Sequence, residues 1–191
     1  MDHRAQTDFL LMEQLATRHS PRAFDPDAEL SDEQIGSLLE AARWSASSSN
    51  SQPWRLFVVR RGTPEFDRVV AALASGNQSW ATNASVLIVN VAKMVTDEGK
   101  EEKWAAYDVG QAAAHLSIQA TDMGLIVHQM GGFDGEALSA AVGIDADHRP
   151  WTVLAVGYHG DISVLSEKLQ ERENKPRARK PLDEIAPGWR G

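Results

Sequence analysis

The sequence predicts an α/β or α+β domain in which helices cover a single sheet. Two segments, Trp54–Val59 and Ser85–Ala92, are apolar over most of their length, as strands buried on both faces are. Segments whose apolar residues recur at helical spacing lie between and around them. The sequence shows no repeat with a period of roughly 20–50 residues and no domain boundary, so residues 1–191 are expected to form one domain.

The second predicted helix has a complete start signal. Ser31 can cap it, and Gln34 can close a capping box with Ser31. Leu30, which precedes the cap, can pack on Ile35 as a hydrophobic staple. This helix is expected to stop near Trp44.

The other elements follow from the same rules. Pro64 stands at the first position of a helix capped by Thr63, and this helix is expected to end at Gly76. Gly124 ends a long helix over about Glu102–Met123. The remaining predicted elements are helices over Thr7–Thr17, Asp134–Val142 and Ser166–Glu173, and strands over Trp54–Val59, Ser85–Ala92, Gly124–Met130 and Trp151–Tyr158.

The middle of the long helix, Val109–His115, is small and nearly apolar on every side. A helix that is apolar all round must be buried all round. In a domain of this size, one of its faces is expected to be covered by a second subunit.

Composition excludes several classes of function. The 27 acidic and 19 basic residues give a net charge of −8, which argues against a nucleic-acid partner because such affinity depends on cations at phosphates. The chain has no cysteine, which excludes disulfides, iron–sulfur clusters and thiol catalysis. Its apolar runs are too short to span a membrane, and Phe9–Met12 is too short for a signal peptide. A soluble, cytoplasmic protein is expected.

Common catalytic motifs are missing as well. The sequence contains no Gly-x-Ser-x-Gly elbow, no His-Glu-x-x-His helix, no phosphate loop and no Gly-x-Gly-x-x-Gly fingerprint. The six histidines lie far apart without ligand spacing, so no metal site is expected. A nucleotide would have to be held in another way.

Two polar stretches stand where stability does not require them. Arg18–Arg22 offers two guanidinium forks, which suit bidentate binding of a phosphate. The alternative is a solvated helix C-terminus, where cations favour the helix dipole. Ser47–Gln52 offers hydroxyls and amides that can read a ring edge with alternating carbonyls and nitrogens, as in a flavin or a pyrimidine. The alternative there is a flexible linker.

These motifs resemble those of the FMN-dependent nitroreductase family. The family's Arg-x-Ser-x-Arg-x-Phe stretch is matched at residues 18–24, and its Ser-Ser-x-Asn-x-Gln-Pro-Trp run at residues 47–54. Further matches follow in the same order and carry the resemblance to about Ile185: Asn77 with Trp80, Tyr107-Asp108-x-Gly110, Gly131-Gly132-Phe133, Gly157-Tyr158 and Arg179-Lys180-Pro181-Leu182.

The resemblance implies an α+β sandwich with a mainly antiparallel sheet flanked by helices, in an intertwined homodimer with two FMN sites at its interface. The residues that it assigns to one subunit's side of the site are Arg18, His19, Ser20 and Arg22 at the phosphate, ribityl chain and ring edge, Asn77 at the pyrimidine side, Gly131 and Gly132 with backbone N–H groups beside N5, and Arg177 and Arg179 at the phosphate. The residues that it assigns to the motif approaching from the partner subunit are Ser47, Ser48, Asn50 and Gln52.

Two departures from the family pattern bear on activity. Trp80 stands where some members carry a cation near the flavin. The connection Lys93–Lys103 is short, whereas larger members insert a helical excursion there that covers the active site. A small or partner-supplied lid is therefore expected, with Trp104 and Tyr107 as candidate pocket aromatics. The alternative for both aromatics is ordinary core packing.

The resemblance implies an oxidoreductase that uses FMN, with NAD(P)H as co-substrate, to reduce nitroaromatic, quinone or similar planar acceptors by a ping-pong two-electron mechanism. Such chemistry takes place at flavin N5 and needs no catalytic side chain. The alternative, favoured by the short lid, is a non-catalytic FMN-binding protein that stores flavin or senses redox state. A third is different flavin chemistry on a metabolite, such as dehalogenation or dehydrogenation.

Overall fold

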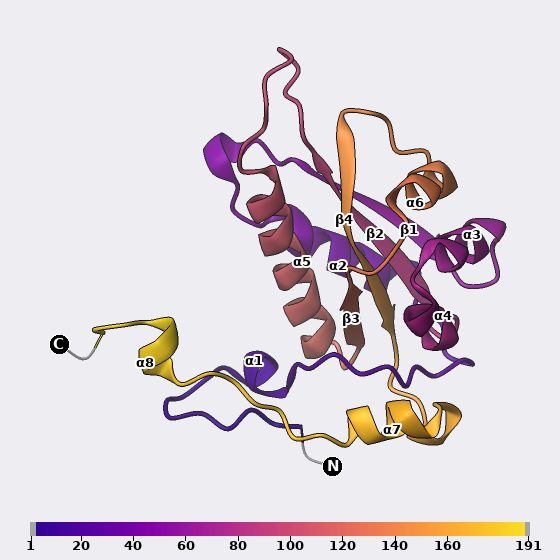
Figure 1. Cartoon of the computed structure of the whole chain (residues 1–191), viewed down its shortest axis with the longest axis vertical. Coiled ribbons are helices and arrows are strands. Elements are labelled where there is room, and N and C mark those ends of the chain that lie inside the picture. Colours follow the sequence, from indigo (N-terminus) through magenta and orange to yellow (C-terminus); the bar gives the residue numbers. More distant parts are fainter. Residues whose placement is uncertain (1–2, 190–191) are drawn as a thin grey trace.

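The computed structural model describes residues 3–189, in which four strands form an antiparallel sheet in the order β1–β2–β4–β3 (Figure 1). The strands are β1 (Trp54–Arg60), β2 (Val86–Lys93), β3 (Ile126–Met130) and β4 (His148–Gly157). β2 and β4 occupy the centre, and β1 and β3 form the edges. The expected α+β class with an antiparallel sheet is confirmed.

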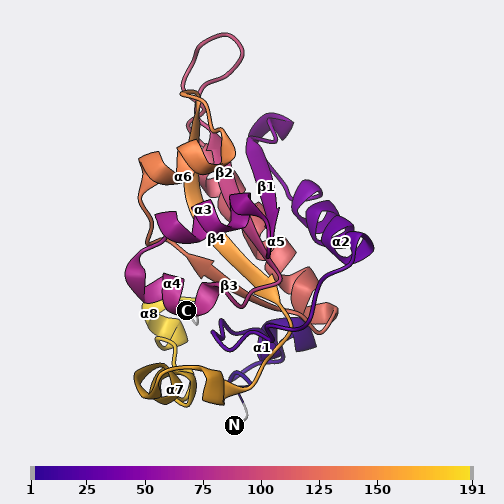
Figure 2. The same ribbon diagram turned by 90° about the vertical axis from the view of Figure 1, so that its right-hand side faces the viewer.

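Helices cover both faces of the sheet. α2 and α5 pack on one face, and α3, α4 and α6 lie over the other (Figure 1, Figure 2). α1, α7 and α8 gather toward the lower end of the molecule in both views. The helices are α1 (Glu13–Thr17), α2 (Asp32–Arg43), α3 (Pro64–Ala72), α4 (Ser75–Ala81), α5 (Ala105–Asp122), α6 (Gly135–Val142), α7 (Glu167–Glu173) and α8 (Leu182–Ile185), with short 3-10 turns η1 (Ser48–Asn50) and η2 (Ile162–Val164).

Strand β2 builds both cores. Its residues Val86 and Ile88 belong to the core under α2 and α5, while Leu87 and Val89 belong to the core under α3 and α6. Successive side chains of a strand point to opposite faces, so a strand covered on both sides needs apolar residues at every position. This is the reason for the nearly continuous apolar run that predicted the strand. The run is interrupted by Asn90, which is buried and donates to the Thr152 hydroxyl (3.3 Å).

The start signal of α2 works as the sequence predicts. The Ser31 side chain accepts from the Gln34 backbone N–H, and the Gln34 side chain accepts from the Ser31 backbone N–H. Leu30 and Ile35 are buried in the same core, and Trp44 is the C-cap. The cap predicted at Asp134 is also present.

Two predicted helices are wrong in extent. The helix expected over Thr7–Thr17 shrinks to α1, because Met12 has extended backbone and the Leu10 and Leu11 side chains before it are exposed, Leu10 fully. The helix expected to reach Gly76 stops at α3, because Leu73 takes extended backbone and bridges to Phe133. The chain then resumes as α4.

Helix α5 is buried on one side only within the single chain. Val109, Ala112 and Ala113 are buried, but Gly110 and Ala114 are exposed. Residues 3–189 of one chain therefore leave a face of small residues uncovered, and the burial expected on every side is not met within one subunit.

The loop after α1 is fastened to the chain that follows β4. The Gly160 N–H donates to the Ala23 carbonyl (2.8 Å), and the Asp25 N–H donates to the Tyr158 carbonyl (3.0 Å). A β-carbon built on Gly160 would lie 2.5 Å from the Phe24 carbonyl oxygen, so only glycine allows this approach. The contact fixes the position of the arginine-containing loop just before it.

Gly160→Ala is expected to lower the free energy of unfolding by roughly 1–3 kcal/mol, because the added methyl group forces the two backbones apart. Gly36→Ala is the matched control: a β-carbon there meets nothing within 4 Å, and alanine inside a helix stabilises by up to about 1 kcal/mol. Urea denaturation measures both. A Gly160→Ala variant as stable as the parent would contradict the close-approach argument.

Candidate functional site

Three arginines from distant parts of the chain meet beside α1. One Arg177 nitrogen, Nη1, donates to the carbonyls of His3 (2.7 Å) and Ala16 (2.8 Å), which fastens the C-terminal tail to the N-terminal segment. Burial lowers the pKa of Arg18, and the charge of Arg179 lowers it further. The pKa of Arg177 is lowered by burial and then by the charges of Arg179 and Arg18.

The positive charge of this arginine cluster (Arg18, Arg177 and Arg179) is not offset by acids. Among residues 3–189, no ion pair joins any of the three to a carboxylate. Like charges held together in this way repel one another, and an anion with several acceptor oxygens would relieve the repulsion. The cluster has the donor chemistry of a phosphate site.

His19 lies against the arginine cluster. Its ring stacks on His3, with 4.6 Å between the ring centroids, and faces His159 at 6.5 Å. Nδ1 lies 3.2 Å from the Thr17 carbonyl, whereas Nε2 is buried and has no hydrogen-bond partner in the described part of the chain. Burial lowers the pKa of His19. A buried polar atom without a partner, next to clustered cations, indicates a place for a ligand.

Arg22, unlike the arginine cluster, already has an anionic partner. Its Nη1 lies 2.8 Å from Oε1 of Glu173, and its backbone N–H donates to Oε2 (3.1 Å). Glu173 is not recognisable from the sequence, because no local pattern relates it to Arg22, which lies 151 positions earlier. The only signal was its place at the end of a predicted polar helix.

Trp80 is the buried aromatic residue next to Arg22. It is fully buried, with its ring stacked near Phe24 and in contact with His128, 4.6 Å between centroids. The guanidinium of Arg22 lies 6.0 Å from the Trp80 ring centroid. Trp80 is therefore a core side chain, and the cation next to it is Arg22 of the loop after α1.

Asn77 and the glycine pair lie together at the end of β3. The Asn77 side-chain amide donates to the Gly132 carbonyl (3.3 Å), and the Ala74 N–H donates to the same carbonyl (2.9 Å). A β-carbon on Gly132 would approach Ala74 to 3.3 Å, whereas one on Gly131 would meet nothing. Both glycines are exposed, so their backbone is accessible to a ligand.

Residues 47–52 form a shaped loop and not a flexible linker. Ser49, Asn50 and Gln52 have φ of 51°, 58° and 48°. Residues other than glycine adopt this left-handed backbone conformation rarely, because it costs conformational free energy. The Ser48 N–H donates to Asp108 (3.0 Å), and the Gln52 N–H donates to the Ser47 hydroxyl (3.1 Å). The Gln52 side-chain amide also donates to the Asn50 carbonyl (3.2 Å), and both residues are exposed.

The two motifs lie far apart in one chain. The loop that contains η1 lies beside the N-terminal end of α5 at the upper end of the molecule, whereas the segment around α1 and the tail lies at the lower end (Figure 1). One chain therefore brings together Arg18, His19, Arg177 and Arg179, and separately Asn77 with Gly132. It does not bring Ser47, Ser48, Asn50 and Gln52 to either group.

The candidate pocket aromatics are on the surface. Trp104, the N-cap of α5, is 58% exposed, and Tyr107 is 65% exposed. Ordinary core packing within the chain is therefore wrong for both. The connection before them is the narrow excursion at the upper end of Figure 1, closed by a bridge between Val95 and Glu101.

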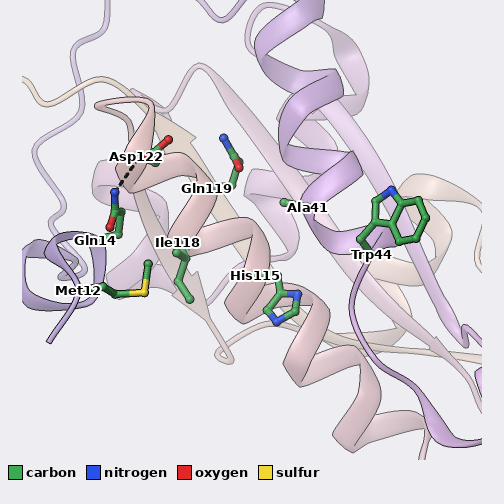
Figure 3. A pocket seen from close by; sticks show the side chains of 8 residues that line it. All are labelled: Met12, Gln14, Ala41, Trp44, His115, Ile118, Gln119 and Asp122. Carbon is green, nitrogen blue, oxygen red and sulfur yellow. Dashed lines mark hydrogen bonds between the residues drawn. The ribbon is translucent and has the colours of Figure 1, made fainter.

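A groove that the sequence analysis did not identify runs between α1, α2 and α5 (Figure 3). Its volume is about 490 Å³, and a hydrogen bond from Gln14 to Asp122 (2.6 Å) closes one end. His115 faces the groove and lies 2.9 Å from the Ser45 hydroxyl through Nδ1. The lining residues are Met12, Gln14, Ala41, Trp44, His115, Ile118, Gln119 and Asp122. None of them belongs to the predicted cofactor set.

Among residues 3–189, no helix combines the length and hydropathy needed to cross a bilayer. In the same residues, histidine and carboxylate side chains do not gather in threes as metal ligands would.

The structure is an α+β protein with an antiparallel sheet and a cluster of three arginines beside α1, and comparison with known proteins agrees with this fold class. The sequence model of the nitroreductase family matches residues 15–158, and the chain belongs to that family. An uncharacterised 15.4 kDa protein of Mycolicibacterium smegmatis is 39% identical over 142 residues, which are 69% of this chain and 93% of that protein.

Longer relatives and solved structures cover nearly the whole chain. A putative NAD(P)H nitroreductase of Bacillus subtilis is 28% identical, with 92% of this chain and 95% of that protein aligned. A crystal structure of an oxidoreductase containing FMN superimposes with a TM-score of 0.90 at 33% identity, covering 97% of this chain and 94% of that one.

The buried His128 should make the free energy of unfolding depend on pH. Burial, followed by the charge of Arg22, lowers the pKa of His128, so the unfolded chain binds a proton at pH values where the folded chain does not. The free energy of unfolding should therefore rise with pH in the range just below about 6.5, by at most about 1.4 kcal/mol per pH unit from this residue. In His128→Gln, the part of this pH dependence that comes from His128 should be lost. Urea denaturation of the flavin-free protein at several pH values measures it, and an unchanged slope in the variant would contradict the argument.

Proposed function

We propose that this chain, as a single domain in a homodimer, is an FMN-dependent oxidoreductase that uses NAD(P)H to reduce nitroaromatic, quinone or similar planar acceptors. The observation that carries the proposal is the arginine cluster, which within residues 3–189 forms no ion pair with a carboxylate and lies beside the orphaned Nε2 of His19. Such a cluster suits the terminal phosphate of FMN. The 33% identical FMN-containing oxidoreductase supports the choice of ligand.

The described residues fit FMN in two regions. Arg18, Arg177 and Arg179 would hold the phosphate with charge-assisted hydrogen bonds, and His19 and Ser20 would contact the adjoining ribityl chain. Arg22 and Asn77 would meet the ring edge. The backbone N–H groups of Gly131 and Gly132 would lie beside N5, where exposed glycine backbone permits close approach.

The partner subunit would complete the site. Ser47, Ser48, Asn50 and Gln52 lie at the far end of their own chain, so they would reach a flavin bound by the other subunit. The exposed small face of α5 (Gly110 and Ala114) and the groove along α1, α2 and α5 are the surfaces that a partner would cover. The left-handed loop is held by its own hydrogen bonds, which would present its amides without further ordering.

FMN, when bound, supplies two-electron transfer between NAD(P)H and an acceptor that occupy the same place in turn. The protein's own residues bind, orient and neutralise. The arginine cluster fixes the phosphate, and the glycine pair and Asn77 fix the ring. A guanidinium near the N1–O2 edge favours the negative charge that reduction places there. No side chain is assigned as nucleophile or proton donor.

The second candidate is a non-catalytic FMN-binding protein, and the exposure of Trp104 and Tyr107 beside a short connection favours it. Such an open surface would leave the ring accessible to water. Anaerobic steady-state oxidation of NADH and NADPH with a panel of nitroaromatics and quinones separates the two candidates. Turnover with any acceptor supports the oxidoreductase, and bound flavin without turnover supports the store or sensor.

The purified protein is expected to be yellow and to release FMN, not FAD, on denaturation, because the arginine cluster suits a terminal phosphate. Absorbance spectroscopy and chromatography of the released cofactor make this test. A colourless protein that fails to bind added FMN would overturn the proposal.

Arg18→Ala is expected to weaken FMN binding by about ten- to a hundredfold, because one charge-assisted phosphate contact contributes on the order of 1.5–3 kcal/mol. Arg68→Ala, which removes an exposed arginine of α3, is the matched control and should bind FMN like the parent. Fluorescence titration of the apoprotein measures both. Equal affinity in Arg18→Ala and Arg68→Ala would remove Arg18 from the site.

Mixing two binding-deficient variants tests the shared interface. Asn50→Ala should also weaken binding, but through the partner subunit. After mixing and refolding with Arg18→Ala, each heterodimer would contain one site with a normal Arg18 and a normal Asn50, so half of its flavin capacity should return. No recovery beyond either parent, or a monomer that retains flavin in sedimentation, would rule out the shared site. An obligate dimer of this kind buries more than about 2,000 Å² in total.

A further inference from the structure

The contact between Arg22 and Glu173 differs from the other ion pairs of the molecule. Glu173 is the last residue of α7, and its side chain is only 8% exposed. Both of its carboxylate oxygens accept hydrogen bonds from Arg22, Oε1 from the guanidinium (2.8 Å) and Oε2 from the backbone N–H (3.1 Å). Exposed ion pairs contribute little, whereas in this partly buried pair, in which the Arg22 side chain is 24% exposed, two hydrogen bonds fix the carboxylate against Arg22.

Arg22 stands at the ring end of the candidate site. Its guanidinium lies over Trp80 of α4, and Asn77 lies one turn earlier on the same helix and contacts Gly132. α7 lies below α4 in both overall views, which brings the end of α7 to this side of the site (Figure 1, Figure 2). Within the described part of the chain, the arginine cluster at the proposed phosphate end forms no ion pair with a carboxylate, whereas Arg22 at the proposed ring end is paired with Glu173.

We propose that Glu173 is a positioning residue that fixes the Arg22 guanidinium at the flavin ring edge and offsets its charge, and thereby sets the reduction potential of the bound flavin. This inference rests on the proposed FMN site. A bare guanidinium at the ring edge stabilises the reduced flavin over the oxidised one, because reduction adds negative charge there. A carboxylate in contact with the guanidinium cancels part of that effect, and burial reduces the screening by water.

The two halves of the pair affect the potential in opposite directions. Loss of the Glu173 charge leaves Arg22 uncompensated and favours reduced flavin. Loss of the Arg22 charge leaves the Glu173 carboxylate uncompensated, and its negative charge disfavours reduced flavin. A role of Glu173 in fastening α7 alone would change stability without giving potential shifts of opposite sign.

The test is the two-electron midpoint potential of the FMN-bound full chain, measured by spectroelectrochemistry on Glu173→Gln and Glu171→Gln. Glutamine keeps the shape and one acceptor oxygen but removes the charge. The expected result for Glu173→Gln is a shift to more positive potential, with reduced FMN gaining at least about tenfold in affinity over oxidised FMN, which corresponds to about 30 mV. Glu171 is exposed on the same helix, so Glu171→Gln makes the same charge change away from Arg22 and should leave the potential unchanged.

Two further variants test the inference if Glu173→Gln folds poorly or loses its flavin. Arg22→Gln should shift the potential to more negative values, and Glu173→Asp, which restores the charge, should keep it near that of the parent. An unchanged potential in Glu173→Gln, or an equal shift in Glu171→Gln, overturns the inference. If Glu173→Gln cannot be measured, an unchanged or more positive potential in Arg22→Gln overturns it. Failure of the parent protein to bind FMN would contradict the proposed function instead.

Discussion

The guanidinium of Arg177 joins the two ends of the chain, and the candidate site depends on this interaction. Its hydrogen bonds to the carbonyls of His3 and Ala16 tie the tail to α1. The tie brings Arg179 close enough to Arg18 to lower its pKa. Two backbone carbonyls thus hold a cation where other cations repel it, and this repulsion is relieved when an anion is bound. The sheet supports this site, because the Gly160 N–H, just after β4, donates to the Ala23 carbonyl of the loop that follows α1.

The distribution of charge fits a ligand with two different ends. The protein is acidic overall, yet its arginine cluster has no acidic partner within residues 3–189. At the other end of the candidate site, Arg22 is paired with the buried Glu173. In the proposed site, a phosphate is bound best by uncompensated positive charge. At the flavin ring, the net charge of the neighbouring side chains affects the reduction potential, so a partly compensated cation has a different effect from a bare one. The same residue type therefore has opposite surroundings at the two ends.

The sequence predicted local features well and long-range ones poorly. The capping box at Ser31 and the fully buried β2 depend on neighbours in the chain, so their patterns are visible in the sequence. The helix expected over Thr7–Thr17 was wrong because apolar spacing does not show whether a core is present to receive Leu10. Leu73 ended α3 through a bridge to Phe133, a contact that no local rule contains. The candidate cofactor residues came from the family resemblance, and Glu173 was missed because its role depends on a fold-level contact.

The central claim is that the arginine cluster recognises the phosphate, and the affinity of the apoprotein for FMN compared with riboflavin tests it most directly. The two ligands share the ring and the ribityl chain and differ in the phosphate. Contacts from any two of the three arginines, each contributing at least about 1.5 kcal/mol, predict that FMN binds roughly a hundredfold more tightly than riboflavin or better, measured by calorimetry at one ionic strength. Equal affinities for FMN and riboflavin would contradict the account.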